Sequence, residues 1–574
     1  MSEQRNVIFA VILSIAILLG YQYFFMKPTP KPAVPPTSPA VSDSATPVAP
    51  PQTGPGTETV TPVATRQTRE EVIAAGNRVQ INTPRLKGSI SLTGARIDDL
   101  TLPTYKETEA PDSKAVTLLS PSGAPKPYFI EMGWSTSEAG VKVPSATTQW
   151  TANGTELTPS TPVELWWDNG EGLTFVRSIS VDDHYVFTVT QRIENATDKP
   201  VTLYPYGLIA RVGLPILEGY SVLHEGPLGV LDGKLEEIKY DKLKDKPFSA
   251  DTTGGWIGIT DKYWLTGLLF DQKTPVHAKF TERDIGGTPR YQVDYLMKSV
   301  TVAPGASQEV TNRVFAGAKE VKTISAYEEK FGIDKFDRAV DFGWFYFLTK
   351  PFFYILDYLY NLFGNFGVAI LGFVVLLRLA MFPLANKSYR SMNAMKRVQP
   401  ELKKLQERHK DDKSRLQQEM MSLYKREKAN PMSGCLPMLI QIPVFFALYK
   451  VLFITIEMRH APFFGWITDL SVPDPTNIFT LFGLIDWTPP HLMHLGIWPL
   501  AMGISMWMLQ KLSPSPPDPT QAKIMQFLPV VFTFMLAKFA AGLVIYWTFS
   551  NCLSMLQQYV LLKTEKPHAH HVKK

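Results

Sequence analysis

The stretch "NFGVAILGFVVLLRLAMFPLAN", residues 365–386, decides how this chain can be arranged. It is an apolar run of the length that crosses a lipid bilayer as a helix, about 20 residues. It also contains Arg378, whose guanidinium stays charged at any physiological pH. An intramembrane cation costs about 2.5–3.5 kcal/mol even on the mildest scale, and such residues usually serve a function. The segment therefore predicts a membrane helix that carries a special site.

Further apolar blocks lie on both sides of this segment. They predict spans at 1–26, 431–456, 494–511, 523–540 and 541–562, which makes six in total. The last two blocks abut and require a tight hairpin around Lys538 and Gly542. The first block is interpreted as an uncleaved signal anchor rather than a cleaved signal peptide, because its apolar run is longer than the usual h-region.

The chain between the first two spans differs in composition. Residues 27–65 are rich in Pro, Ala and Thr and predict a disordered linker. Residues 66–340 contain short β-rich runs separated by turn signals such as "DNGEG" and "NATDKP", which predict a large antiparallel β-sandwich closed by a helix. Residues 341–364 are aromatic but interrupted by polar residues, and they predict an amphipathic helix lying in the membrane interface.

The distribution of Lys and Arg predicts the orientation. Segment 387–430 carries 13 of them, segment 457–493 carries one, and the tail 563–574 carries four lysines. The positive-inside rule places 387–430, the short loop 512–522 and both termini in the cytoplasm. The β domain and the 457–493 loop then lie outside, in the periplasm of a Gram-negative cell. The predicted fold class is an α-helical polytopic membrane protein with six spans, a five-helix core and an inserted all-β domain.

The cytoplasmic segment 387–430 is expected to be a helical hairpin. Apolar residues recur at heptad-like spacing, and "HKDDK" between them suits a turn; they are Met395, Val398, Leu402 and Leu405, then Leu416, Met420 and Leu423. A plain solvated loop is the alternative. Thirteen basic and six acidic residues give the segment a net charge of +7, a surface suited to anionic lipid or ribosomal RNA.

The surroundings of Arg378 allow two interpretations. Its long side chain could snorkel to the headgroups. Against this, the last five spans contain no Asp or Glu to pair with it, so the cation needs water and therefore a cavity. Polar residues of the third and sixth spans could line that cavity; they include Gln441, Tyr546, Thr548, Ser550, Asn551 and Ser554. The cavity should open to the cytoplasm, because Arg378 lies near that end of its span.

The Arg378 span, the motif "DDKSRLQQEMMSLYKREKANPMSGCLPMLIQIPVFFALY" and "GLVIYWTFSN" resemble the YidC membrane protein insertase family along the whole chain. The resemblance implies a hydrophilic groove around Arg378, with Gln441, Tyr546, Trp547 and Asn551, open to cytoplasm and lipid. It also implies a slide for substrate helices along the third and fifth spans, including Pro443 and Phe445. The β domain would be a supersandwich related to sugar mutarotases. Val374 and Trp547 depart from the family's commoner threonine and tyrosine.

The function implied by this resemblance is that of an insertase and chaperone of the bacterial inner membrane. It would insert, fold and assemble integral membrane proteins, alone or with the Sec translocon. The implied partners are nascent membrane proteins, the Sec translocon, membrane lipids, and ribosomes that meet the hairpin and the basic tail. We expect no enzymatic activity and no cofactor. No nucleotide is expected to be required, and no GxxxxGK[ST] motif is present. The net charge of +5 does not indicate nucleic acid, and no specific DNA binding is expected.

Other classes of protein remain open at the level of sequence. A transporter or channel could use an intramembrane arginine, but internal repeats and intramembrane carboxylates are missing. An anchored periplasmic enzyme could use groups of the β domain, such as His184, His224 and His277 with Asp183 and Glu225. The β domain could also be a scaffold. The two cysteines, Cys435 and Cys552, lie in predicted spans, so they form no disulfide framework in the β domain, and no Cys/His spacing indicates a metal site.

Overall fold

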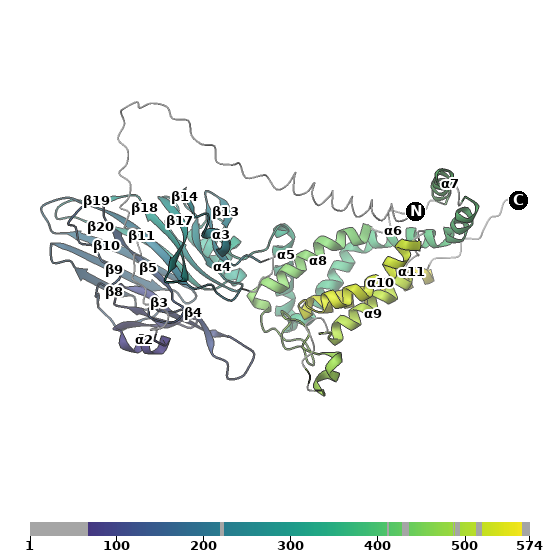
Figure 1. The fold of residues 1–574 in the computed structure, drawn as a ribbon, viewed down its shortest axis with the longest axis horizontal. Coiled ribbons are helices and arrows are strands. Elements are labelled where there is room, and N and C mark those ends of the chain that lie inside the picture. Colours follow the sequence, from purple (N-terminus) through teal and green to yellow (C-terminus); the bar gives the residue numbers. More distant parts are fainter. Residues whose placement is uncertain are drawn as a thin grey trace, which may run out of the picture. The chain divides into compact units, whose positions relative to one another are not determined.

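The computed structural model describes residues 67–217, 223–409, 412–427, 436–485, 487, 494–512 and 519–564. The predicted anchor at 1–26, the predicted linker at 27–65 and nearly all of the basic tail lie outside these residues. Within the described chain, strands occupy residues 78–318 and long helices follow from residue 346 (Figure 1). The prediction of a strand-rich domain followed by a helical region is confirmed. These two parts are called the β domain and the helical region below.

The strands of the β domain form two sheets. The first contains β1 (Arg78–Asn82), β2 (Lys87–Ser91), β3 (Arg96–Lys106), β4 (Ala115–Leu119), β5 (Tyr128–Ser135), β7 (Glu156–Leu157), β11 (Val201–Val212), β14 (Phe248–Thr253), β17 (Pro275–Ile285), β18 (Thr288–Met297) and β19 (Val300–Val302). The second contains β6 (Thr151–Ala152), β8 (Val163–Asp168), β9 (Leu173–Val181), β10 (Val186–Asn195), β12 (Gly226–Leu231), β13 (Lys234–Glu237), β15 (Trp256–Thr260), β16 (Trp264–Leu269) and β20 (Ser307–Ala318).

Alternation of side chains along the strands produces the core of the β domain. In β10, Phe187, Val189 and Ile193 are buried, while Thr190 faces outward and shares a 2.8 Å hydroxyl contact with Thr311 of β20. Successive residues of a strand point to opposite faces, so one face of each sheet can enter the common apolar core. Pairing is antiparallel at every named strand pair but one: β1 and β7 run parallel. The predicted antiparallel pairing has this one exception among the described strands, at an edge where β7 has only two residues.

Short helices accompany the strands. They are α2 (Arg69–Ala75), α3 (Tyr240–Leu243), α4 (Val321–Phe331) and the 3-10 turn η2 (Phe336–Ala339). The helix predicted to close the β domain is α4. It ends at Gly332, whose φ of 62° is left-handed, a conformation that glycine adopts at little cost.

The helical region begins with α5 (Tyr346–Phe363) and continues with α6 (Phe366–Arg408), α7 (Lys413–Arg426), α8 (Leu436–Ile454), η4 (Ile456–Met458), η5 (Ile478–Gly483), α9 (Ile497–Leu512), α10 (Pro519–Leu536) and α11 (Ala541–Thr564). The side chain of Asn365 caps α6 by accepting a 3.0 Å hydrogen bond from the Val368 amide. Among the described residues, one helix, α6, is long and apolar enough to cross a membrane. The six spans and the five-helix core therefore stay predictions.

Helix α6 continues without a break from the Arg378 segment into the basic segment that follows it. Its far half packs against α7 through a small apolar cluster. That cluster contains Ala394, Val398, Leu402, Leu423 and Tyr424, with Met395, Leu405 and Met420 at its edge. It includes most of the residues whose heptad-like spacing predicted the hairpin seam.

Polar contacts join the β domain to the helical region. Lys450 of α8 pairs with Asp341 at 2.8 Å, and the carboxylate of Glu457 in η4 accepts a 2.9 Å hydrogen bond from the Val321 amide at the start of α4. Arg459 donates to the carbonyl oxygens of Lys106 and Glu107 at 2.7 and 3.1 Å. The segment after α8 is thus held to two separate parts of the β domain.

Candidate functional site

Arg378 lies on α6 and is held by α11. Its guanidinium donates to the carbonyl oxygen of Ser550 at 3.0 Å and also to the Ser550 hydroxyl. The side chain is half-buried, whereas Ser550 is buried. Among the ion pairs found in the described residues, none includes Arg378. Its described partners are therefore the neutral oxygens of Ser550. Ser550 is one of the polar residues predicted to line a cavity.

A polar face of α11 is turned toward the protein interior. Ser550, Asn551, Ser554 and Gln558 are all buried, and their spacing of three and four residues places them on one side of the helix. The Asn551 amide donates to the Ser505 hydroxyl of α9 at 3.0 Å. Burying so many polar groups is unfavourable unless they find partners, and here some partners come from neighbouring helices.

Helices α6 and α11 run in the same direction. Arg378 meets Ser550, and further along both helices the Gln557 amide donates to Asn386 at 2.8 Å. An apolar cluster of Ala385, Tyr389 and Leu561 continues this seam. A parallel pair is the arrangement expected if both helices cross a membrane from the same side.

The other predicted groove and slide residues gather on the first turns of α11. Gln441 of α8 donates to the hydroxyl of Tyr546, which is buried. The next residue, Trp547, makes an edge-to-face contact with Phe445 of α8 at 4.9 Å and lies 5.6 Å from Phe532 of α10. Trp547 is thus placed between the helices that were predicted to form the slide.

The structure gives described contacts for all the predicted site residues except Pro443, which lies inside α8, and it also adds partners. Ser505 was missed, because one serine in the apolar block 494–511 gives no signal of what it contacts. Val374, where a threonine was the commoner family residue, is fully buried in an apolar cluster. The two described pockets have volumes of about 460 and 440 Å³, and neither is lined by Arg378. The groove itself stays a prediction.

The candidate enzyme groups of the β domain have separate environments. His277 is exposed and lies 2.8 Å from Asp251. The ring of His224 is buried and lies 3.0 Å from the carbonyl oxygen of Pro227, and burial lowers its pKa to about 4. His184 makes an edge-to-face contact with the neighbouring Tyr185. No described contact joins any two of these histidines.

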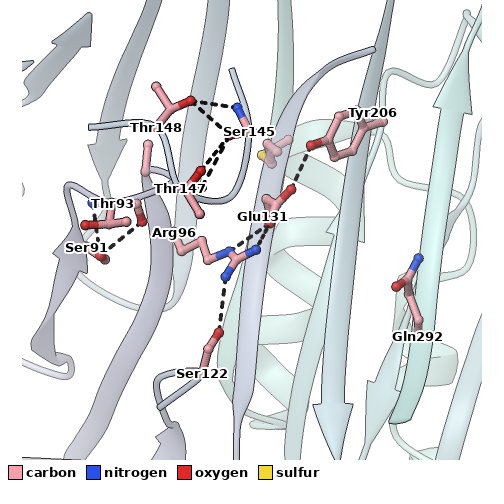
Figure 2. Close-up of polar contacts among 12 residues, drawn as sticks. Ser91, Thr93, Arg96, Ser122, Glu131, Ser145, Thr147, Thr148, Tyr206 and Gln292 are labelled. Carbon is pink, nitrogen blue, oxygen red and sulfur yellow. Dashed lines mark hydrogen bonds and ion pairs between the residues drawn. The ribbon is translucent and has the colours of Figure 1, made fainter. Parts of the chain in front are cut away.

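A buried polar network on the first sheet is closed by its own contacts (Figure 2). Arg96 donates to Glu131 at 2.7 Å and to Ser122 at 3.1 Å, and the Tyr206 hydroxyl donates to the other Glu131 oxygen at 2.7 Å. Burial, together with the neighbouring Glu131 carboxylate, raises the pKa of Tyr206 well above its usual value. Both carboxylate oxygens already have protein donors, which is the pattern of a structural network.

The fold and the site together define a two-part protein, in which a strand-rich domain is followed by a helical part whose helix α6 is long and apolar enough to cross a membrane. Comparison with known families agrees with this division. The YidC periplasmic domain family matches residues 78–355, and the 60Kd inner membrane protein family matches residues 358–568. The chain belongs to the YidC family.

Close relatives extend over nearly the whole chain. A protein of Beijerinckia indica subsp. indica is 50% identical over 98% of this chain and 96% of its own length, and one of Methylobacterium nodulans is 51% identical over 98% and 95%. Both relatives are named membrane protein insertase YidC. A crystal structure of an active YidC insertase matches 88% of this chain and 96% of its own length, at 15% identity and a TM-score of 0.36.

Proposed function

We propose that this protein inserts integral membrane proteins into the bacterial inner membrane and helps them fold, through a hydrophilic groove that opens to the cytoplasm. The observation that carries this proposal is Arg378, a cation in an apolar helix whose described partners are the neutral oxygens of Ser550. A guanidinium has five donor hydrogens, so this contact leaves capacity for an incoming carboxylate. The relatives named as insertases support the same activity.

In this mechanism the groove attracts the polar part of a substrate. Arg378 binds acidic groups in the N-terminal tail or hairpin loop of a nascent chain. Gln441 on α8, with Tyr546 and Asn551 on α11, offers further hydrogen bonds. These contacts lower the cost of bringing hydrophilic residues into the plane of the membrane. Transfer of about 20 apolar residues into lipid supplies the driving force, so no nucleotide is required.

The substrate's apolar helix leaves along α8 and α10. Pro443 and Phe445 lie on α8, and Trp547 contacts both Phe445 and Phe532 of α10. Both helices also carry exposed apolar side chains; they include Ile442, Phe446, Phe527, Val531 and Phe534. Such a surface suits lipid and an apolar substrate helix equally, which is what a slide requires.

The proposed topology has six spans, with both termini and the α6–α7 hairpin in the cytoplasm. The parallel direction of α6 and α11 supports this orientation. The basic hairpin and the tail are then on the side where ribosomes and anionic lipids are available. Association with the Sec translocon is part of the same proposal. Helix α5, with exposed Phe347, Tyr358 and Leu362, lies in the outer interface.

A cysteine-labelling experiment tests the groove. Cys435 and Cys552 are first replaced by Ala, and then Arg378→Cys is compared with Leu379→Cys in intact cells and in inverted vesicles. Leu379 is the neighbouring residue on α6, and its side chain is 63% exposed on the protein surface, so it reports lipid at nearly the same depth. A thiol in dry lipid stays protonated and reacts slowly.

The groove predicts that position 378 reacts with a polar thiol reagent supplied from the cytoplasm, while position 379 reacts little. Labelling of position 378 from both sides would instead indicate a channel. No labelling from either side would show that Arg378 is a topology anchor without a hydrated groove.

A further inference from the structure

Three potential metal ligands meet where the β domain contacts the segment after α8. Glu109 lies in the turn between β3 and β4, whereas His460 and Asp469 follow η4. One ligand atom from each residue lies within 4.8 Å of the others. We propose that Glu109, His460 and Asp469 bind a divalent transition-metal cation of the Zn²⁺ type, and that the cation fixes the β3–β4 turn to the segment after η4.

The chemistry of the three side chains fits such a cation. An imidazole nitrogen with two carboxylate oxygens is a ligand set for Zn²⁺ and similar borderline ions, whereas Mg²⁺ and Ca²⁺ prefer oxygen alone. Two carboxylates balance the charge of a divalent cation. Three protein ligands leave at least one position for water, so the site is open rather than closed.

Asp469 gives an independent indication of a missing partner. The residue is only 3% exposed, and the one hydrogen bond it makes in the described structure runs from the Ser471 amide to Oδ1 at 2.7 Å. No described residue donates to Oδ2. Because the residue is nearly buried, this oxygen has little access to water, and a bound cation would be a favourable partner for it.

A neighbouring contact places the other two ligands. Arg459 donates to the carbonyl oxygens of Lys106 and Glu107, which holds the strand end that leads to Glu109 close to His460. Glu109 is exposed and its side chain can move onto the cation.

The sequence could not indicate this site. Its ligands come from two parts of the chain that are far apart, and none of them belongs to a short Cys/His pattern of the kind that marks zinc sites. Their juxtaposition depends on the contact between the β domain and the helical region.

The test measures Zn²⁺ binding to the full chain in detergent, after chelator treatment, by isothermal titration calorimetry. His568, His570 and His571 in the tail are replaced by Ala, and so are Cys435 and Cys552, because these groups bind Zn²⁺ by themselves. In this background we expect Glu109→Gln and His460→Ala each to weaken binding at one site by about tenfold or more. Glu109 is exposed, so its variant tests the site without disturbing the fold.

His277→Ala is the matched control, since His277 also lies beside a carboxylate, that of Asp251, but outside the cluster. It should leave the affinity and the stoichiometry unchanged. The site should also give a visible Co²⁺ spectrum that Asp469→Asn abolishes. The proposal is overturned if Glu109→Gln and His460→Ala bind Zn²⁺ with the affinity and stoichiometry of the parent chain.

Discussion

At the scale of single residues, we propose two roles for Arg378 that substitutions can separate. Its hydrogen bonds to Ser550 hold α11, and its remaining donors, which have no partner among the described residues, would meet a substrate. Hydrogen bonds to charged groups contribute about 1.5–3 kcal/mol each, so losing them affects a rate by about tenfold or more.

Arg378→Ala should reduce insertion of substrates with acidic translocated tails about tenfold, whereas Arg378→Lys should retain more activity because it keeps the charge. The measurement is protease protection of a small membrane protein in cells depleted of the parent chain. A substrate whose translocated tail has no acidic residue serves as the control and should be less affected. Equal insertion of acidic-tail substrates by the Ala variant would contradict the role of Arg378.

Glu457 is a buried carboxyl group at the contact between α4 and the segment after α8. One oxygen accepts from the Val321 amide, while the other, Oε2, is buried without a hydrogen-bond partner among the described residues. Burial raises its pKa from 4.5 to about 7, and the nearby Glu320 and Asp357 act in the same direction. The folded state therefore holds this proton at pH values where the unfolded chain has lost it.

The sign of the pH dependence follows from this raised pKa. Between about pH 4.5 and 7 the folded state binds more protons than the unfolded state, so the stability contributed by Glu457 falls as pH rises through that window. Glu457→Gln should therefore raise the melting temperature at about pH 8 and change it little at about pH 5, with a difference on the order of 3 kcal/mol. Thermal unfolding in detergent measures this effect. An equal shift at both pH values would show that Glu457 does not titrate in the window.

The sequence predicted the importance of a single residue only where its polarity differs from that of the residues around it. Arg378 stands out in an apolar run, and the polar residues of 541–562 are too frequent for a lipid-facing helix. Ser505, Glu457 and the Glu109–His460–Asp469 cluster gave no such signal. Each acquires its role from a partner that is distant in the chain, and sequence periodicity does not report such partners.

At the scale of secondary-structure elements, α9 and α10 approach each other at Gly503. A Cβ atom placed there would lie 2.0 Å from the Thr533 hydroxyl oxygen, far inside van der Waals contact. The Thr533 hydroxyl donates to the carbonyl oxygen of Pro529 at 2.7 Å, so the side chain is fixed on its own helix. Ser505, the partner of Asn551, lies two residues further along α9.

Gly503→Ala should therefore push α9 from α10 and disturb the Ser505–Asn551 contact. Overpacking of this kind costs about 1–3 kcal/mol. The melting temperature in detergent should fall, and insertion should fall with it. Gly372→Ala in α6 is the control, because the added Cβ would meet its nearest neighbour, a Phe363 ring carbon, at 3.3 Å. Equal stability of the two variants would mean that the α9–α10 contact is looser than described.

The α6–α7 hairpin was predicted from the sequence only in part. The seam of the hairpin could be predicted because heptad-like spacing is a local pattern. The direct continuation of α6 into the hairpin could not be predicted. The change from apolar to basic residues near residue 386 marks where the helix passes from an apolar to an aqueous environment, and it does not mark the end of the helix. Asn386 and Tyr389 still contact α11, so the functional boundary of the hairpin lies beyond them.

At the scale of the whole molecule, the β domain and the helical region each have their own apolar core. This division was predictable from the composition of the chain and from the periodicity of its strands, which place the strands before the long helices. The parallel pairing of β1 with β7 was not predictable, because strands of two residues carry no periodic pattern. The number of spans stays a prediction from the sequence, since among the described helices only α6 is long and apolar enough to cross a membrane.

Removal of residues 78–318 should leave most insertion activity, if the helical region is the machine. The cut must extend to Ala318, because β20 pairs with β10 and β16 and would otherwise be left as an exposed, aggregation-prone strand. It must spare α4, whose first amide binds Glu457. A complementation assay with immunodetection of the truncated chain measures the outcome. Loss of activity in a chain that is abundant and folded would place the function in the periplasm.

The contact between Arg378 and Ser550 also has a consequence for the protein's own biosynthesis. The two residues are 172 positions apart, and ribosomes add about 5–20 residues per second, so α6 exists for about 10–35 s before its partner helix is made. During that interval the guanidinium must be accommodated by lipid headgroups, by water or by another protein. The site is completed only when the last described helix enters the membrane. A chain interrupted before α11 therefore resembles one of the half-made clients that an insertase handles.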